Sequence, residues 1–368
     1  MKFAHSSKLS YLLFGKEPGA GRKIYIDYLR LLATVFVICV HTFSLARDQY
    51  VPGTTVYQTL EFATFIFTIS NLLFVMISGA LLLPVRGESA SDFFQKRFSK
   101  IVIPLLVYYL LYIFAKQGIE PFYPRNWMKL IQRILIGPPV EAPHFWLVYT
   151  IFWLYVLTPF LRYLVSNIPD SVMNGVMGVL FAMTVVDTYA PLFSVTSPFS
   201  GIVDTFAIVF VFGYYLTNRC SKRVEWLVFV GGIASVVLTG CLIFRTADYG
   251  DYIFNNAPTM MLAAGAVVVL VKHLVSDEHH ESLFTRLIAK YSFSILMIHW
   301  GVLHVVVKKM LHVDVTSGGI VGGCLLMVVL TFVISTVGAV IVDNTVVLAV
   351  RTILSEIGRG IVKYFKRK

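Results

Sequence analysis

Charged residues are scarce in this chain of 368 residues. Asp, Glu, Lys and Arg make up 14% of it, hydrophobic residues make up 57%, and the mean hydropathy is +0.76. A water-soluble domain normally carries about a quarter of its residues as charged side chains, so this composition excludes a soluble enzyme and a disordered chain. We therefore expect an integral membrane protein.

Cysteine is also rare. The four residues Cys39, Cys220, Cys241 and Cys324 are scattered, three of them lie inside apolar runs, and none has CxxC spacing. This pattern excludes a disulfide framework and gives no metal site, so we expect no bound metal. The chain has no internal repeat and no low-complexity stretch.

Acidic residues are outnumbered by basic ones, 20 against 31, which gives a net charge of +11. A chain this basic can bind nucleic acid, but here Lys and Arg lie between and beyond the apolar runs instead of on one amphipathic face. That placement is typical of membrane topology. The expected partner is therefore the lipid bilayer and not a nucleic acid.

Ten apolar runs are long enough to cross about 30 Å of hydrocarbon. An even count predicts that both termini lie on the same side. Three of the runs are short and the last could extend to Val350, so nine or eleven crossings remain open. The runs are residues 24–46, 60–83, 101–117, 144–164, 172–190, 201–217, 226–244, 253–275, 291–307 and 319–341.

The basic residues also predict the orientation, because Lys and Arg are retained in the cytoplasm during insertion. With the N-terminus inside, 22 of them lie on the cytoplasmic side and eight outside. The first run begins late and lacks a small-residue cleavage site, which indicates a retained helix and not a signal peptide. We expect an all-α, multi-pass protein of the plasma or inner membrane, with cytoplasmic segment 1–23, transmembrane domain 24–350 and basic cytoplasmic tail 351–368.

A loop on the predicted outer side has helical periodicity. Its apolar residues recur on one face, which predicts a short helix in the membrane interface, either a lid or a plain connector. They are Trp127, Leu130, Ile131, Ile134 and Leu135.

A loop on the predicted cytosolic side is basic. In the stretch SDFFQKRFSK, Lys96, Arg97 and Lys100 can share one side of a helix. Ordinary positive-inside topology explains this cluster equally well.

The first run contains three ionisable residues, Asp27, Arg30 and His41. Such residues cost about 2.5–3.5 kcal/mol on insertion scales, so those that persist usually face the bundle interior. Arg30 and His41 are eleven residues apart, which places them on one helical face and roughly 16 Å apart along the axis. They can bracket a long, thin ligand, with Arg30 near the cytosol and His41 near the outer end. Asp27, one turn before Arg30, can hold its guanidinium.

Structural roles compete with these functional ones. His41 fits a packing residue or a histidine at the level of the headgroups, and Arg30 fits a cation that snorkels to the interface. Other polar residues in the runs are open to the same two interpretations. Small residues such as Ser78 and Gly79 are typical of close helix packing.

Three further candidates lie at the predicted outer half of the bundle. His144 and Trp146 open the fourth run, where an aromatic belt explains the tryptophan but not the histidine. His299 lies near the middle of the ninth run. It fits either a packing role or a place beside the site.

Six motifs, in this order, resemble the acyltransferase 3 family of membrane O-acyltransferases, which acetylate bacterial surface glycans. Arg30 and His41 match the family motif of Arg, ten intervening residues and His, and the resemblance covers roughly residues 24–310. The motifs read YIDYLRLLATVFVICVH, FVMISGALLLP, FFQKRFSKIVIP, HFWLVYTIFWLYVLTPFL, FVFGYYL and YSFSILMIH.

The sequence departs from the family pattern in three ways. Lys100 stands where a second arginine is usual, which keeps the charge but loses bidentate phosphate geometry. Val75 and Met76 replace the usual aromatic pair of the second motif. We also expect this chain to act without the extracytoplasmic hydrolase-like domain that is fused to some relatives.

The resemblance implies that acyl-CoA docks from the cytosol as a co-substrate and is not held as a permanent cofactor. The acyl group, in the simplest case acetyl, is then expected to reach a hydroxyl of a surface polysaccharide or lipid-linked glycan outside. Arg30 and His41 are implied as the catalytic pair, and Arg30 is also implied in donor binding together with Lys96, Arg97 and Lys100. His41 is implied as the general base or as an acyl-histidine nucleophile. Asp27, His144, Trp146 and His299 are implied in structural or acceptor-side roles.

A secondary transporter of a small polar solute is the alternative, because polar residues on one helical face also line ion pathways. The sequence shows no inverted repeat and no matching pair of helices broken by Gly or Pro, which disfavours this alternative. It gives no prediction of oligomeric state.

Overall fold

The computed structural model describes residues 22–365, apart from 86, 202–203, 246–249, 255–256 and 276–281, together with residues 10, 13 and 14. Every regular element in this described part is a helix, which confirms the all-α prediction. Most of the expected segment 1–23 and the last three residues of the expected tail 351–368 lie outside the described residues. The domain boundaries therefore stay predictions.

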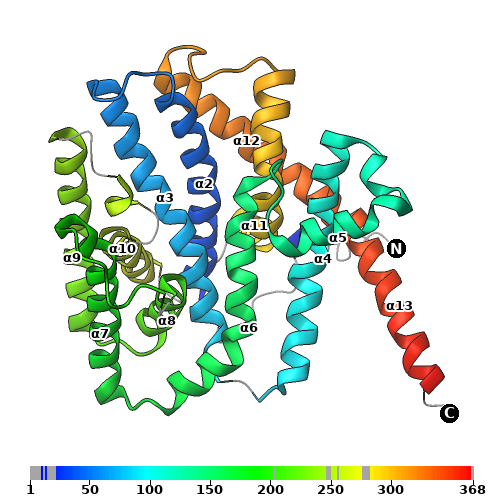
Figure 1. The fold of residues 1–368 in the computed structure, drawn as a ribbon, viewed down its shortest axis with the longest axis horizontal. Helices are drawn as coiled ribbons and strands as arrows, with labels where there is room; N and C mark the ends of the chain where they lie inside the picture. Colours follow the sequence, from blue (N-terminus) through cyan, green and yellow to red (C-terminus); the bar gives the residue numbers. More distant parts are fainter. Residues whose placement is uncertain are drawn as a thin grey trace.

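The described helices follow the apolar runs in order (Figure 1). They are α2 (Ile24–Arg47), α3 (Thr55–Leu82), α4 (Ala90–Gln117), α5 (Trp127–Ile136), α6 (Trp146–Asn167), α7 (Asp170–Tyr189), α8 (Thr205–Asn218), α9 (Lys222–Arg245), α10 (Pro258–Leu274), α11 (Leu283–Gly301), α12 (Ile320–Val342) and α13 (Leu348–Phe365). Two π-helical segments, η6 (Val302–Met310) and η7 (Asp343–Val347), continue α11 and α12.

Eight helical stretches within the described part are long and apolar enough to cross a membrane. Two of the expected runs form shorter helices, α8 and α10. A multi-pass membrane protein is thus confirmed. The count of ten crossings and the cytoplasmic placement of both termini stay predictions.

Several helices are longer than the apolar runs that predicted them. α4 begins at Ala90, where the Ser89 hydroxyl accepts a hydrogen bond from the Asp92 N–H, so the basic stretch 91–100 is helical, as its spacing allows, and is continuous with the apolar run. α11 begins at Leu283 in the same way, capped by Ser282. Polar helix ends extend beyond the hydrocarbon, and their starts are set by caps that hydropathy does not detect. The last stretch continues past residue 341 into α13, which extends away from the bundle in Figure 1.

Helices α2 and α3 form the centre of the bundle. α2 packs against α3, α11 and α12, while α3 also packs against α8 and α9. Glycines permit the close approach of α3 and α8: a Cβ on Gly79 would lie 1.8 Å from the Phe210 carbonyl oxygen, and one on Gly213 would lie 2.2 Å from that of Met76. The packing role expected for Gly79 is therefore confirmed.

The expected amphipathic helix is present as α5. Its residues Leu130 and Ile134 pack against the core, whereas Met128 and Leu135 are each 77% exposed. The Tyr149 hydroxyl donates a hydrogen bond to the Ile134 carbonyl at 2.6 Å. α5 is thus fixed against α6 with an apolar face outward, and its residence in the interface stays a prediction.

Candidate functional site

Arg30 and Asp27 form the pair that their spacing predicts. Arg30 Nη1 donates to Asp27 Oδ1 at 2.8 Å, and the carboxylate is only 2% exposed. Arg22 binds the other carboxylate oxygen, with its Nε at 2.8 Å and its Nη2 at 2.7 Å. One buried carboxylate therefore orients two guanidinium groups at the beginning of α2.

Arg30 lies between two cavities. One, of about 340 Å³, is lined by Arg22, Asp27, Arg30 and Asn218 among others. The other, of about 350 Å³, is lined by Arg30 of α2, Arg97 and Lys100 of α4, and Lys290 of α11 among others. We call the second one the cationic cavity. Within the described part of the chain, no Asp or Glu lines it, so its chemistry suits an anion with several charges.

The structure does not bring Lys96 into this cavity. Lys96 is 62% exposed, and its ammonium lies 3.6 Å from a carboxylate oxygen of Glu88. The other Glu88 oxygen is 3.6 Å from Arg162. Of the three basic residues expected in the 91–100 stretch, Arg97 and Lys100 line the cavity and Lys96 does not.

The His41 ring faces α11. It lies 5.2 Å from that of His299, centroid to centroid, in a stacked arrangement, and 5.0 Å from that of Trp300. His144 completes the group, 4.9 Å from His299 and 5.8 Å from Trp300. The rings of His41 and His144 therefore each contact both His299 and Trp300, and the His304 ring lies 4.2 Å from that of Trp300. We call His41, His144, His299 and Trp300 the histidine cluster.

Backbone carbonyls fix the tautomers of two of these imidazoles. His144 Nε2 lies 3.1 Å from the Met297 oxygen and His299 Nδ1 lies 2.7 Å from the Leu296 oxygen. A carbonyl only accepts, so in the neutral rings these nitrogens carry the protons. His144 Nδ1 and His299 Nε2 are then bare acceptors, and both are buried without a hydrogen-bond partner in the described part of the chain. Hydroxyl groups of a bound molecule can donate to them.

Tyr112 of α4 interrupts α11 beside this cluster. Its hydroxyl donates to the Met297 carbonyl at 3.1 Å and accepts from the Gly301 N–H at 2.8 Å, two groups that pair with each other in an uninterrupted α-helix. An inserted side chain of this kind bends a helix, and the π-helix η6 begins at the next residue, Val302. The turn that carries His299 and Trp300 is thus held by a side chain of another helix.

The cationic cavity and the histidine cluster meet at Leu296. This residue lines the cavity, and its carbonyl accepts the hydrogen bond from His299 Nδ1. On α2 the same two regions are marked by Arg30 and His41, roughly 16 Å apart along the helix. His41 itself is not among the residues that line the described cavities.

Trp146 lies away from the cluster. It is 37% exposed and its ring contacts Phe206 at 5.6 Å, so the tryptophan at the site is Trp300.

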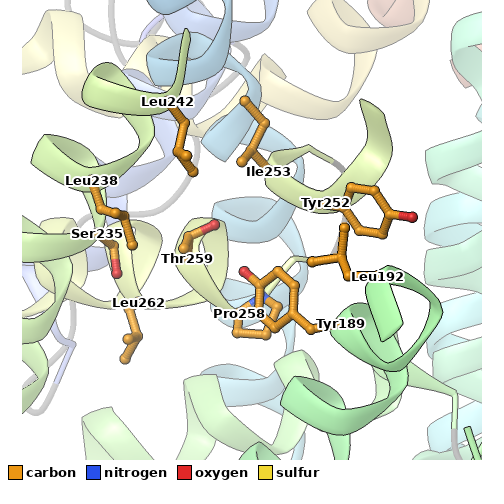
Figure 2. Close-up of a pocket in the computed structure, with 10 residues that line it drawn as sticks. All are labelled: Tyr189, Leu192, Ser235, Leu238, Leu242, Tyr252, Ile253, Pro258, Thr259 and Leu262. Atoms are coloured by element: carbon orange, nitrogen blue, oxygen red, sulfur yellow. The ribbon is translucent and has the colours of Figure 1, made fainter. Parts of the chain in front are cut away.

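A further cavity, of about 330 Å³, lies between α9, α10, η4 (Ala190–Phe193) and η5 (Gly250–Ile253), as Figure 2 shows. Among the described residues that line it there is no Lys, Arg, His, Asp or Glu and none of the expected site residues. Leu238, Leu242 and Leu262 are among its side chains, with the hydroxyls of Tyr189 and Thr259 also facing it (Figure 2). It does not suit a phosphorylated donor.

Within the described residues, no three His, Cys, Asp or Glu side chains are arranged to hold a metal ion. Glu141 lies in the segment between α5 and α6. Burial raises its pKa, but hydrogen bonds from Gln117 and the charge of Arg133 lower it by more, so the pKa lies below its usual value. The ion pair between Arg133 and Glu141 connects α5 to the segment before His144, and the hydrogen bond from Gln117 to Glu141 connects the end of α4 to the same segment.

Sequence reasoning missed Lys290, Trp300 and Tyr112. Lys290 was counted with a loop because the apolar run begins after it, and Trp300 follows directly on the expected His299. The adjacency of Trp300 to a candidate histidine was a usable signal. Nothing in the sequence marks Tyr112, because its role depends on the contact between α4 and α11.

Comparison with known proteins identifies the family of this chain. The acyltransferase domain family matches residues 23–342. A Bacillus subtilis (strain 168) protein named "Putative membrane-bound acyltransferase YfiQ" is 23% identical over 300 residues, which cover 74% of this chain and 79% of that protein. No solved structure matches the chain. The family match spans the central helices, the cationic cavity and the histidine cluster, and the chain belongs to the acyltransferase 3 family of membrane proteins.

Proposed function

We propose that this membrane acyltransferase moves an acetyl group from acetyl-CoA, bound from the cytosol, to a hydroxyl of a surface polysaccharide or lipid-linked glycan outside. The observation that carries the proposal is the position of Leu296, which belongs to the wall of the cationic cavity and holds the His299 imidazole at 2.7 Å. A charged donor site and a group of imidazoles thus adjoin on the same two helices, α2 and α11.

The donor site would be the cationic cavity. CoA carries a diphosphate and a separate phosphate on its ribose, and Arg30, Arg97 and Lys100 supply charges of the opposite sign. Lysine at position 100 binds phosphate as a point charge, so the bidentate contacts fall to the two arginines. The narrow pantetheine arm would extend from there toward His41.

His41 would act as the general base. A sugar hydroxyl is a weak nucleophile at neutral pH, and a neutral imidazole that accepts its proton accelerates such an attack by about 10²- to 10⁴-fold. The hydroxyl oxygen bonds to the thioester carbonyl carbon as its proton passes to His41. The tetrahedral intermediate then collapses, the C–S bond breaks, and the leaving thiolate takes the proton from the imidazolium. An ester and the free thiol of CoA are the products.

His144 and His299 would bind the acceptor. Their bare nitrogens can accept hydrogen bonds from hydroxyls but cannot donate to a developing oxyanion while the rings are neutral. A polyhydroxylated acceptor offers the donors that these two nitrogens need. Trp300 contacts the rings of His41 and His144 and would help to hold these imidazoles in place.

Two measurements test the proposal. Purified protein in detergent should release free thiol from acetyl-CoA, slowly with water and faster with a glycan acceptor. Mass spectrometry of surface glycans should show an acetyl ester that is lost when the protein is absent. Solute uptake without any thiol release would contradict the proposal and favour a transporter.

A further inference from the structure

Lys290 is a cation that the fold carries to the donor site from a distant part of the chain. It lies in the second turn of α11, far in sequence from Arg97 and Lys100, yet it lines the same cationic cavity. Its ammonium lies 4.8 Å from the ring centroid of Tyr291. Cations therefore reach this cavity from three helices, α2, α4 and α11.

The face of α11 that meets the cavity is continuous. Ala289, Phe293 and Leu296 recur at helical spacing and all line the cavity, with Lys290 beside the first of them. Lys290 is exposed, whereas Leu296 is 1% exposed and reaches the histidine cluster. The face thus runs from an open end at Lys290 to a closed end at the imidazoles.

This difference in exposure along the face indicates which part of a donor each residue can contact. The thioester must be at the imidazole end, so the adenosine end of the donor remains at the open end. Arg30 is held by Asp27, and its side chain is partly buried, at 30% exposed. An exposed ammonium suits a phosphate monoester, which it contacts as a point charge without bidentate geometry.

We propose that Lys290 binds the ribose phosphate of the CoA donor and makes the enzyme prefer CoA to 3′-dephospho-CoA. This inference rests on the proposed function. It adds a donor-binding residue from α11 and assigns to it the one phosphate that distinguishes the two donors.

The test compares acetyl-CoA with acetyl-3′-dephospho-CoA in the thiol-release assay. Lys290→Gln should raise the KM for acetyl-CoA about fivefold, as expected for one partly exposed charge-assisted contact, and leave kcat unchanged. The KM for the dephospho donor should not change, so the preference of the wild-type enzyme disappears. Lys290→Arg should retain most of the wild-type preference for acetyl-CoA.

Lys222→Gln is the matched control, because it removes one exposed positive charge from the beginning of α9 and does not line the cationic cavity. An equal KM rise in Lys222→Gln and Lys290→Gln would overturn the inference, since general attraction would then explain the effect. An equal rise for both donors in Lys290→Gln would also overturn it. If the wild-type protein releases thiol from neither donor, the proposed function fails and the inference fails with it, a result distinct from both.

Discussion

Replacing Asp27 with asparagine tests how the donor site is held together. The Asp27 carboxylate is 2% exposed and accepts 2.8 Å hydrogen bonds from Arg30 and Arg22. Asparagine offers only one oxygen and turns an amide donor toward one of the two guanidinium groups. Arg30 would lose the contact that aims it at the cationic cavity, while its own charge remains.

The size of the effect follows from the geometry. A hydrogen bond to a charged group contributes about 1.5–3 kcal/mol, and the lower end applies here because the Arg30 side chain is 30% exposed. About 1.4 kcal/mol corresponds to a tenfold change in affinity. Asp27→Asn should therefore raise the KM for acetyl-CoA about tenfold and change kcat little.

The assay is steady-state thiol release by purified protein whose folding is checked by thermal unfolding in detergent. Arg22→Gln is the matched control, because it removes the other partner of the same carboxylate and leaves the Arg30 contact in place. Its KM should rise less than that of Asp27→Asn. An unchanged KM in Asp27→Asn, or equal changes in the two variants, would refute the reasoning.

Two further predictions concern helix contacts. Gly79→Ala should lower the free energy of unfolding by about 1–3 kcal/mol, because its Cβ would lie 1.8 Å from the Phe210 carbonyl oxygen. Gly178→Ala is the control: a Cβ there meets no atom within 4 Å, so this variant should be neutral or more stable by about 0.5–1 kcal/mol. Equal melting temperatures for the two variants would contradict this prediction. Tyr112→Phe should lower kcat about tenfold with a smaller change in KM, because α11 loses the two hydrogen bonds that hold the turn of His299. A change confined to KM would show that this turn does not depend on the Tyr112 hydroxyl.

The sequence predicted most of the fold because hydropathy dominates it. Each expected apolar run became a helix, and the amphipathic spacing of residues 127–135 became α5. Helix starts were less accurate, since Ser89 and Ser282 cap α4 and α11 well before the hydrocarbon begins. Hydropathy measures burial in lipid and does not report where a helix begins in water.

The candidate site was predictable where its residues share one helix. The spacing of Asp27, Arg30 and His41 fixes their common face. The structure shows the expected contact between Arg30 and Asp27 and places the His41 ring against His299 of α11. The contributions of Lys290 and Tyr112 were not predictable. Both depend on how α11 packs against other helices, which one sequence without a structure does not specify.

The most direct test of the central claim is a single-turnover measurement of acetyl transfer by His41→Ala, with saturating acetyl-CoA and a glycan acceptor. If His41 is the general base, the rate should fall by about 10²- to 10⁴-fold, while the dissociation constant for CoA, measured by calorimetry, stays close to the wild-type value because the cationic cavity is intact. A rate within threefold of wild type in a folded His41→Ala protein would contradict the account.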